Sequence, residues 1–212
     1  IHLPALRHRR IKRNFCGNRS NPCLTLNRPQ MKKLIFATTS RHKLNEIRAM
    51  LPGHDVLGLE DIGYFTEIEE TGLTLEENAS IKALQLYSHI HEASLGEDTG
   101  LEVFALDMAP GVHTARYAGN DRDPAKNMDK LLEQLTSKSD RRARFRTVIA
   151  QADKEGIRLF EGIVNGTISE ARSGAGGFGY DPVFIPEGYD KTFAELASDI
   201  KNNISHRAMA VH

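Results

Sequence analysis

The chain has 212 residues, of which 40% are apolar and 7% aromatic, and it carries 28 basic and 28 acidic residues. This length is sufficient for one globular domain with a sizeable core. No apolar run approaches the roughly 20 residues that cross a bilayer, so we expect no membrane partner.

The balanced charge hides an uneven distribution. Residues 1–30 contain seven Lys or Arg and no acidic residue, so residues 31–212 carry 21 basic and 28 acidic residues. An acidic body argues against binding to nucleic acid, where a basic face neutralises phosphates. We interpret residues 1–30 as a basic leader outside the fold, either a non-native extension or a targeting signal.

Both cysteines, Cys16 and Cys23, lie in this leader. Residues 31–212 therefore carry no disulfide framework and no cysteine-based metal site. This composition fits a reducing compartment, and we predict a cytoplasmic location.

The first half of the body alternates strand and helix patterns. The apolar run 33–39 predicts a buried strand, and residues 44–51 repeat apolar side chains at helical spacing before Pro52. Thr74 and Glu77 have the spacing of a capping box at the start of a second helix. The apolar stripe of that helix consists of Leu75, Ala79, Ala83, Leu86 and Ile90.

The second half adds further strands. The segment 101–106 predicts a strand, and Asp123-Pro124 predicts the start of a helix. Segments 142–153 and 157–168 alternate well enough to predict two antiparallel strands. Because strands and helices interleave without a strict βαβ rhythm, we predict an α/β fold with a mixed sheet.

The turn TTSRHK places three basic residues in the first turn of the first helix. Cations there oppose the positive end of the helix dipole, an arrangement that makes sense if an anion binds among them. Free backbone N–H groups and hydroxyl groups would complete a phosphate cradle, and the alternative is a solvated basic turn. The residues of this turn are Thr38, Thr39, Ser40, Arg41, His42 and Lys43.

Acidic residues cluster in EIEETG, which includes Glu70, and in EDTG, which contains Glu97 and Asp98, each just before a Thr-Gly turn. Carboxylates at loop ends suit Mg²⁺, which is commonly held by one or two of them plus phosphate oxygens. Each cluster taken alone is more typical of a solvated acidic loop than of a metal site. Their coexistence with a phosphate cradle favours the metal.

The stretch SGAGGFGYDP, residues 173–182, contains a G-x-G-x-x-G pattern. A dinucleotide fingerprint must open a helix, whereas PVFIP, residues 182–186, reads as a strand, so we reject a dinucleotide site. What remains is either an ordinary loop or a glycine loop that brings Phe178 and Asp181 to one place. Lys201 and the SHR motif, residues 205–207, add a basic group near the C-terminus.

Six blocks, in order, carry a resemblance to a known family. They are ATTSRHK, EETGLTLEENASIKA, EDTGLEV, PGVHTARYAG, GAGGFGYDPVF and SHRAMA. Together they closely resemble the inosine/xanthosine triphosphate pyrophosphatases, which remove deaminated purine nucleotides, and the resemblance spans residue 31 to the end.

The resemblance implies an elongated, twisted mixed sheet flanked by helices, with the active site in a cleft between two lobes. It also implies a homodimer and a Mg²⁺-dependent hydrolysis of ITP, dITP or XTP to the monophosphate and pyrophosphate. Two alternatives stay open: a related pyrophosphatase acting on other modified nucleotides, and a non-catalytic nucleotide-binding protein.

Residue roles follow from the same resemblance. Glu70 and Asp98 would hold the metal, and Asp98 would also be the general base. Arg207 and His206 would donate to the purine 6-position, with Phe178 stacked on the ring. The full set of implied substrate-binding residues is Thr38, Thr39, Ser40, Arg41, His42, Lys43, Thr99, Phe178, Gly179, Tyr180, Asp181, Lys201, His206 and Arg207.

Two features depart from the family pattern. Ser40 stands where Asn is usual, which shortens the side chain and favours a water-mediated phosphate contact. Family members usually continue into a helix after the SHR motif, and this chain is expected to lack that helix and to be a fragment.

Overall fold

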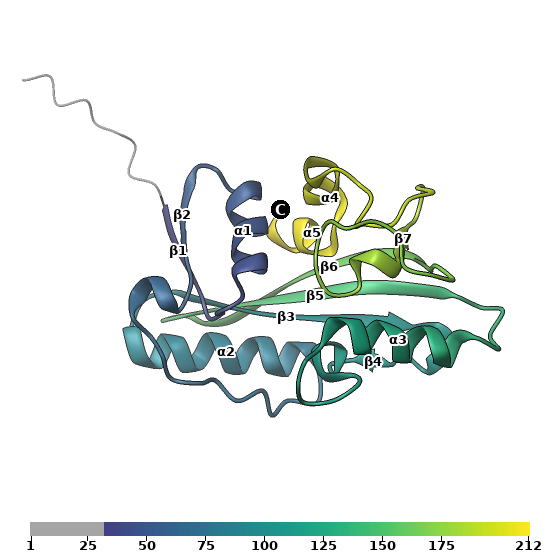
Figure 1. The fold of residues 1–212 in the computed structure, drawn as a ribbon. Coiled ribbons are helices and arrows are strands. Elements are labelled where there is room, and N and C mark those ends of the chain that lie inside the picture. The colour runs from purple at the N-terminus through teal and green to yellow at the C-terminus, as the bar shows by residue number, and fades with distance from the viewer. Residues whose placement is uncertain (1–31) are drawn as a thin grey trace, which may run out of the picture. The chain divides into compact units, whose positions relative to one another are not determined.

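A seven-stranded sheet forms the centre of the structure, a computed structural model that describes residues 32–212 (Figure 1). Its strands are β1 (Lys32–Phe36), β2 (His54–Leu57), β3 (Ser94–Val103), β4 (Pro110–Gly111), β5 (Arg142–Asp153), β6 (Gly156–Ile168) and β7 (Phe184–Pro186). The strand order is β2-β1-β3-β5-β6-β7, with β4 paired to β3. Strand β1 runs parallel to β2 and β3, and the remaining pairs are antiparallel. The predicted mixed sheet is confirmed, while the basic leader lies outside the described residues.

Helices cover both faces of this sheet. They are α1 (Arg41–Met50), α2 (Leu75–Ile90), α3 (Pro124–Leu135), α4 (Ser198–Ile204) and α5 (His206–Val211). Helices α2 and α3 lie on one face, and α1, α4 and α5 lie on the other (Figure 1). In the described chain no helix is both long and apolar enough to cross a membrane.

Alternation along β5 explains why both faces are covered. Val148 and Ala150 pack with the apolar residues of α2, whereas Ile149, between them in sequence, packs with those of α1. Successive side chains of a strand point to opposite faces, so both faces of β5 are apolar and buried. The core therefore consists of separate clusters above and below the sheet.

The local signals for the helix starts are confirmed. Thr74 and Glu77 form the predicted capping box at the start of α2. Asp123 caps α3, with Pro124 in its first turn. Gly96 on β3 lets α2 pack closely, because a Cβ at this position would lie 2.1 Å from the carbonyl oxygen of Ala79.

The strand predicted at 101–106 is wrong at both ends. Strand β3 begins at Ser94 and ends at Val103, and residues 104–106 form a 3₁₀ turn. Glu97 and Asp98 therefore lie inside a strand and not before a turn. The reason is tertiary: β3 pairs with β5 along its whole length, which compensates for the acidic and glycine residues that lower strand propensity.

The glycine loop is followed by a strand, as predicted. Residues 181–183 form a 3₁₀ turn that leads directly into β7, so no helix follows the loop. The local context on which we rejected a dinucleotide-binding fingerprint is therefore the one that the structure has.

Candidate active site

A cavity of about 640 Å³ lies between the part of the fold that contains β1 and α1 and the part that contains the glycine loop and α3. The expected site residues that line it are Thr38, Thr39, Ser40, His42, Lys43, Glu70, Asp98, Thr99, Phe178, Gly179, Tyr180, Asp181, Lys201, His206 and Arg207. Arg41 is not among the lining residues. Its side chain is 83% exposed and pairs with Glu60.

The N-terminus of α1 forms one end of the cavity. Ser40 caps the helix, since its hydroxyl oxygen accepts a hydrogen bond from the Lys43 backbone N–H at 3.4 Å. The hydroxyl proton of Ser40 remains available for donation to a ligand. The first turn holds no acidic residue, so the positive end of the helix dipole is not neutralised locally. These features suit a polyphosphate.

Lys43 connects this end of the cavity to β3. Its ammonium lies 3.5 Å from Oε1 of Glu97. Burial lowers the pKa of Lys43, and the negative charge of Glu97 opposes that effect. The Thr99 hydroxyl donates to the same Glu97 oxygen at 2.8 Å, so Thr99 helps to fix this carboxylate.

Asp98 lies on β3 within reach of Lys82 from α2. The Lys82 ammonium is 3.0 Å from Oδ1 of Asp98 and 3.0 Å from Oε1 of Glu70. Burial raises the pKa of Asp98 against the lowering effect of Lys82. For Glu70 burial also acts to raise the pKa, but the positive charge of Lys82 outweighs it and the pKa is lowered.

Lys82 was missed in the sequence analysis. Its position, directly before Ala83 in the apolar stripe of α2, was the available signal, because a lysine is rarely buried unless it is paired. Its ammonium also donates to the backbone carbonyl of Glu97 at 2.8 Å. Lys82 thus links the two predicted metal ligands, Glu70 and Asp98, to the backbone of β3.

The carboxylates of Glu70 and Asp98 fit a divalent metal. One oxygen of each lies 3.0 Å from the same ammonium nitrogen, so both are directed at a common cationic position. Among residues 32–212 no group of three or more His, Cys, Asp or Glu could hold a metal. Two carboxylates, with the other ligands supplied by water and phosphate, is a donor set that Mg²⁺ commonly uses.

Arg207 also lines the cavity and is fully buried beside Glu97. Its Nε and Nη2 donate to Oε1 of Glu97 at 3.1 and 2.7 Å, and its Nη1 donates to Glu46 of α1. Burial opposes its charge, but Glu97 and Glu46 raise the pKa of Arg207. Glu46 was also missed; it lies three residues after Lys43, one turn along the same helix.

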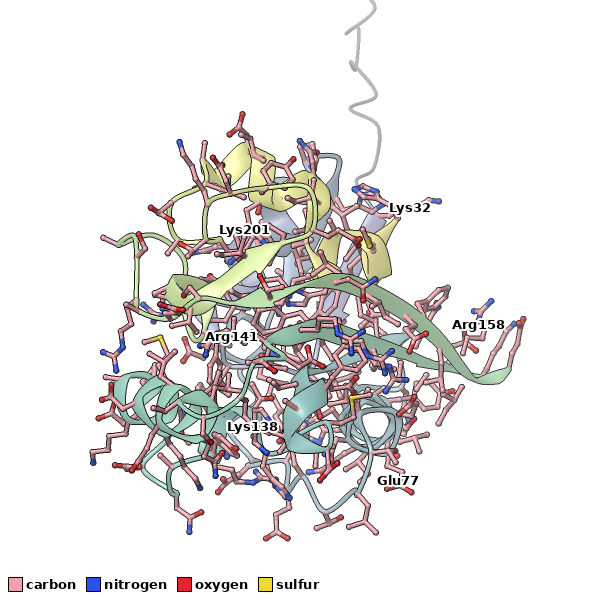
Figure 2. All side chains as sticks on the ribbon, turned by 90° about the vertical axis from the view of Figure 1, so that its right-hand side faces the viewer. Lys32, Glu77, Lys138, Arg141, Arg158 and Lys201 are labelled. Atoms are coloured by element: carbon pink, nitrogen blue, oxygen red, sulfur yellow. The ribbon has the colours of Figure 1, made fainter. Side chains whose placement is uncertain are left out.

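Lys201 joins Glu46 to the glycine loop and lies on the α4 side of the sheet (Figure 2). Its ammonium donates to Glu46 at 2.7 Å and to Asp181 at 2.5 Å. Asp181 in turn accepts the backbone N–H of Phe178 at 2.7 Å. Tyr180 anchors the end of the loop through its hydroxyl, which donates to the Thr114 carbonyl at 3.0 Å.

His206 is a buried neutral group at the cavity wall. Its ring stacks on Phe145 with centroids 4.6 Å apart. Burial lowers the pKa of His206 well below its ordinary value, and Arg207 and Lys201 add to the effect. Its Nδ1 is buried and has no hydrogen-bond partner within the described chain. The residue lines the cavity, but this nitrogen has almost no accessible surface in the described chain.

Comparison with known proteins assigns the chain to a family. The sequence profile of the Ham1 family matches residues 34–212. The chain belongs to the Ham1 family. The matched range includes every residue that lines the cavity.

Relatives of this Ham1 protein align with it over most of its length. The dITP/XTP pyrophosphatase of Porphyromonas gingivalis is 53% identical over 183 residues, which are 85% of this chain and 94% of that protein. The dITP/XTP pyrophosphatase of Bacillus licheniformis is 47% identical over 186 residues, 85% of this chain and 95% of that protein.

Solved structures of Ham1 proteins share the fold. A HAM1 protein from Coxiella burnetii superposes with a TM-score of 0.78 at 36% identity, over 85% of this chain and 95% of that one. The Ham1 protein of Staphylococcus aureus gives a TM-score of 0.76 at 39% identity, over 85% of this chain and 94% of that one. The family resemblance inferred from the six sequence blocks is confirmed.

Proposed function

We propose that this Ham1 protein hydrolyses deaminated purine nucleoside triphosphates, namely ITP, dITP and XTP, to the nucleoside monophosphate and pyrophosphate. The observation that carries the proposal is that one cavity is lined by Asp98 and Glu70, by the α1 N-terminus and by the buried pair His206 and Arg207. The first turn of α1 suits a triphosphate and is called the phosphate end, whereas the wall formed by Phe178, His206 and Arg207 suits a purine and is called the purine end. The names of the similar proteins from P. gingivalis and B. licheniformis support the same activity.

The phosphates would lie at the first turn of α1, near Ser40 and Lys43. Asp98 would accept the proton of the water whose oxygen attacks the α-phosphorus, as the bond to the bridging oxygen breaks and pyrophosphate leaves. Burial raises the pKa of Asp98, which strengthens it as a base. Mg²⁺, held by Glu70 and Asp98, would neutralise charge on the phosphate oxygens.

Selectivity would depend on the donors at the purine end. Arg207 is charged and held by two carboxylates, and His206 contributes its imidazole to the cavity wall. Hypoxanthine and xanthine carry a carbonyl acceptor at the 6-position, whereas adenine carries an amino donor. A buried donor left facing the adenine amino group would cost about 1–3 kcal/mol, which disfavours ATP.

A substrate panel tests this function. Pyrophosphate release is measured with ITP, dITP, XTP, ATP, GTP and modified pyrimidine triphosphates, each with Mg²⁺ and with a chelator. We expect turnover of the three deaminated purines, far less with ATP, and none in the chelator. Preference for a pyrimidine would favour the related pyrophosphatase, and binding without pyrophosphate release would favour a non-catalytic nucleotide-binding protein.

We also propose a homodimer, located in the cytoplasm. Support for association comes from β6, where Ile157, Leu159 and Phe160 are 40%, 49% and 44% exposed. These residues lie near Arg158, at the projecting end of the β5–β6 hairpin (Figure 2). Sedimentation of the wild type and of Phe160→Lys would test whether this end takes part in the dimer.

A further inference from the structure

His42 and Phe178 form a contact between the first turn of α1 and the glycine loop. His42 lies in the first turn of α1, at the phosphate end, and Phe178 lies in the glycine loop. Their rings are stacked, with centroids 5.2 Å apart and planes inclined by 17°. This distance is within the 4.5–7 Å range that favours offset-stacked aromatic pairs.

Phe178 has little local support for its ring. It is flanked by Gly177 and Gly179, which adopt positive φ angles of 69° and 63°. No atom lies within 4 Å of the position that a Cβ of Gly179 would occupy. The hydrogen bond to Asp181 fixes the backbone N–H of Phe178 and not its side chain.

Two cations also lie over this ring. The Lys201 ammonium lies 4.9 Å and the Arg207 guanidinium carbon 5.7 Å from the ring centroid. Both cations are also held by carboxylates, so their positions do not depend on the ring. Within residues 32–212, His42 is the one aromatic ring stacked on Phe178.

The contacts of His42 differ from those of its two basic neighbours. Arg41 pairs with Glu60, and Lys43 pairs with Glu97. His42 is exposed, and no ion pair or hydrogen bond of its side chain is found in the described part of the chain. Stacking on Phe178 is therefore the interaction that the fold assigns to this imidazole.

We propose that His42 is a positioning residue for purine recognition, whose imidazole holds the Phe178 ring in the orientation that stacks on the base. This inference rests on the proposed function, because the base is the purine of the substrate. Holding the ring in place before binding removes part of the ordering cost that binding would otherwise carry. Loss of the imidazole should therefore weaken nucleotide affinity without affecting the chemical step.

Steady-state kinetics of the full chain with ITP and Mg²⁺ test the proposal. In His42→Ala we expect KM to rise roughly two- to tenfold, the range that aromatic pairs give, with kcat within about twofold of wild type. His42→Phe should restore KM, because it keeps the stacking surface, whereas His42→Lys should not. Inhibition by inorganic tripolyphosphate, which has no base, should be unchanged in His42→Ala.

Asn45→Ala is the matched control, because Asn45 is exposed on the same helix and does not line the cavity. It should keep the wild-type KM, and all variants should keep the wild-type melting temperature. Rescue by Lys and not by Phe would overturn the proposal in favour of a phosphate contact. An unchanged or lower KM in His42→Ala would overturn it as well. Failure of the proposed function is a separate result, since wild type would then release no pyrophosphate from ITP.

Discussion

Burial and the Lys82 ammonium have opposite effects on the charged form of Asp98. Burial disfavours its charge, while the Lys82 ammonium at 3.0 Å favours it. The same ammonium contacts Glu70, so one buried cation offsets two carboxylates that would otherwise repel each other. Within residues 32–212 the second oxygen of Asp98 accepts one hydrogen bond, a long one of 3.4 Å from the Asn78 side-chain amide. This oxygen is the better placed of the two to accept a proton from water.

The role of Asp98 leads to a prediction for Asp98→Asn. The amide keeps the shape of the side chain but cannot serve as the base, a role that contributes about 10²–10⁴-fold, and it offers no negative charge to Mg²⁺. We expect turnover of ITP to be abolished while calorimetry still detects nucleotide binding. Asp140→Asn, outside the cavity, is the control. A kcat within a few-fold of wild type would show that another group is the base.

His206 gives a prediction on stability and pH. Burial keeps its folded-state pKa well below the ordinary value of about 6.5 that applies in the unfolded chain. Between these two pKa values the unfolded state binds the additional proton, so stability decreases as pH falls below about 6.5. For each unit by which the pH falls in this range, the free energy of unfolding of wild type should decrease by up to about 1.4 kcal/mol more than that of His206→Gln.

Urea denaturation at pH 7.5 and 5.5 measures this difference. His113→Gln is the control for the substitution itself, since His113 is exposed. The same pH dependence in wild type and His206→Gln would mean that His206 takes up a proton in the folded protein.

At the scale of elements, α1 and α5 hold the phosphate-end and purine-end residues in contact with each other. Helix α1 carries the phosphate-end residues Ser40 and Lys43 in and beside its first turn, and it carries Glu46 one turn later. Glu46 holds Arg207 of α5 and Lys201 of α4 through different oxygens. A shift of α5 against the sheet would therefore disturb the purine end.

Gly162 of β6 allows α5 to pack where it does. A Cβ at this position would lie 2.0 Å from the His206 carbonyl oxygen and 2.4 Å from the Ala210 backbone nitrogen. Gly162→Ala should force α5 away, with a cost of about 1–3 kcal/mol that is typical of overpacking. We expect a lower melting temperature and a higher KM for ITP.

Gly53→Ala is the matched control for this substitution. Gly53 is exposed, and no neighbouring atom lies within 4 Å of the position that its Cβ would occupy. It should leave both the melting temperature and KM close to wild type. Wild-type values in Gly162→Ala would show that α5 can adjust without moving His206 and Arg207.

Across the whole molecule, features that depend on neighbours in sequence were predictable, whereas features that depend on contacts between distant segments were not. The capping box of α2 and the start of α3 depend on neighbours in sequence, and both were predicted correctly. The extent of β3 depends on pairing with β5, some 50 residues away, and was predicted wrongly. Lys82 and Glu46 have roles only through partners on other elements. The glycine loop could be distinguished from a dinucleotide-binding fingerprint because the decisive signal, the strand that follows the loop, is local in sequence.

The placement of the site within the chain predicts the effect of removing residues 1–30. All residues that line the cavity lie between Ala37 and Arg207, and the family match begins at residue 34. We therefore expect the truncated protein to keep the wild-type melting temperature and the wild-type kcat/KM for ITP. Removing residues 1–37 is the contrasting variant, because it also deletes β1, which pairs with both β2 and β3. The protein without residues 1–37 should fail to fold. A large loss of stability in the protein without residues 1–30 would show that the basic segment contributes to the domain.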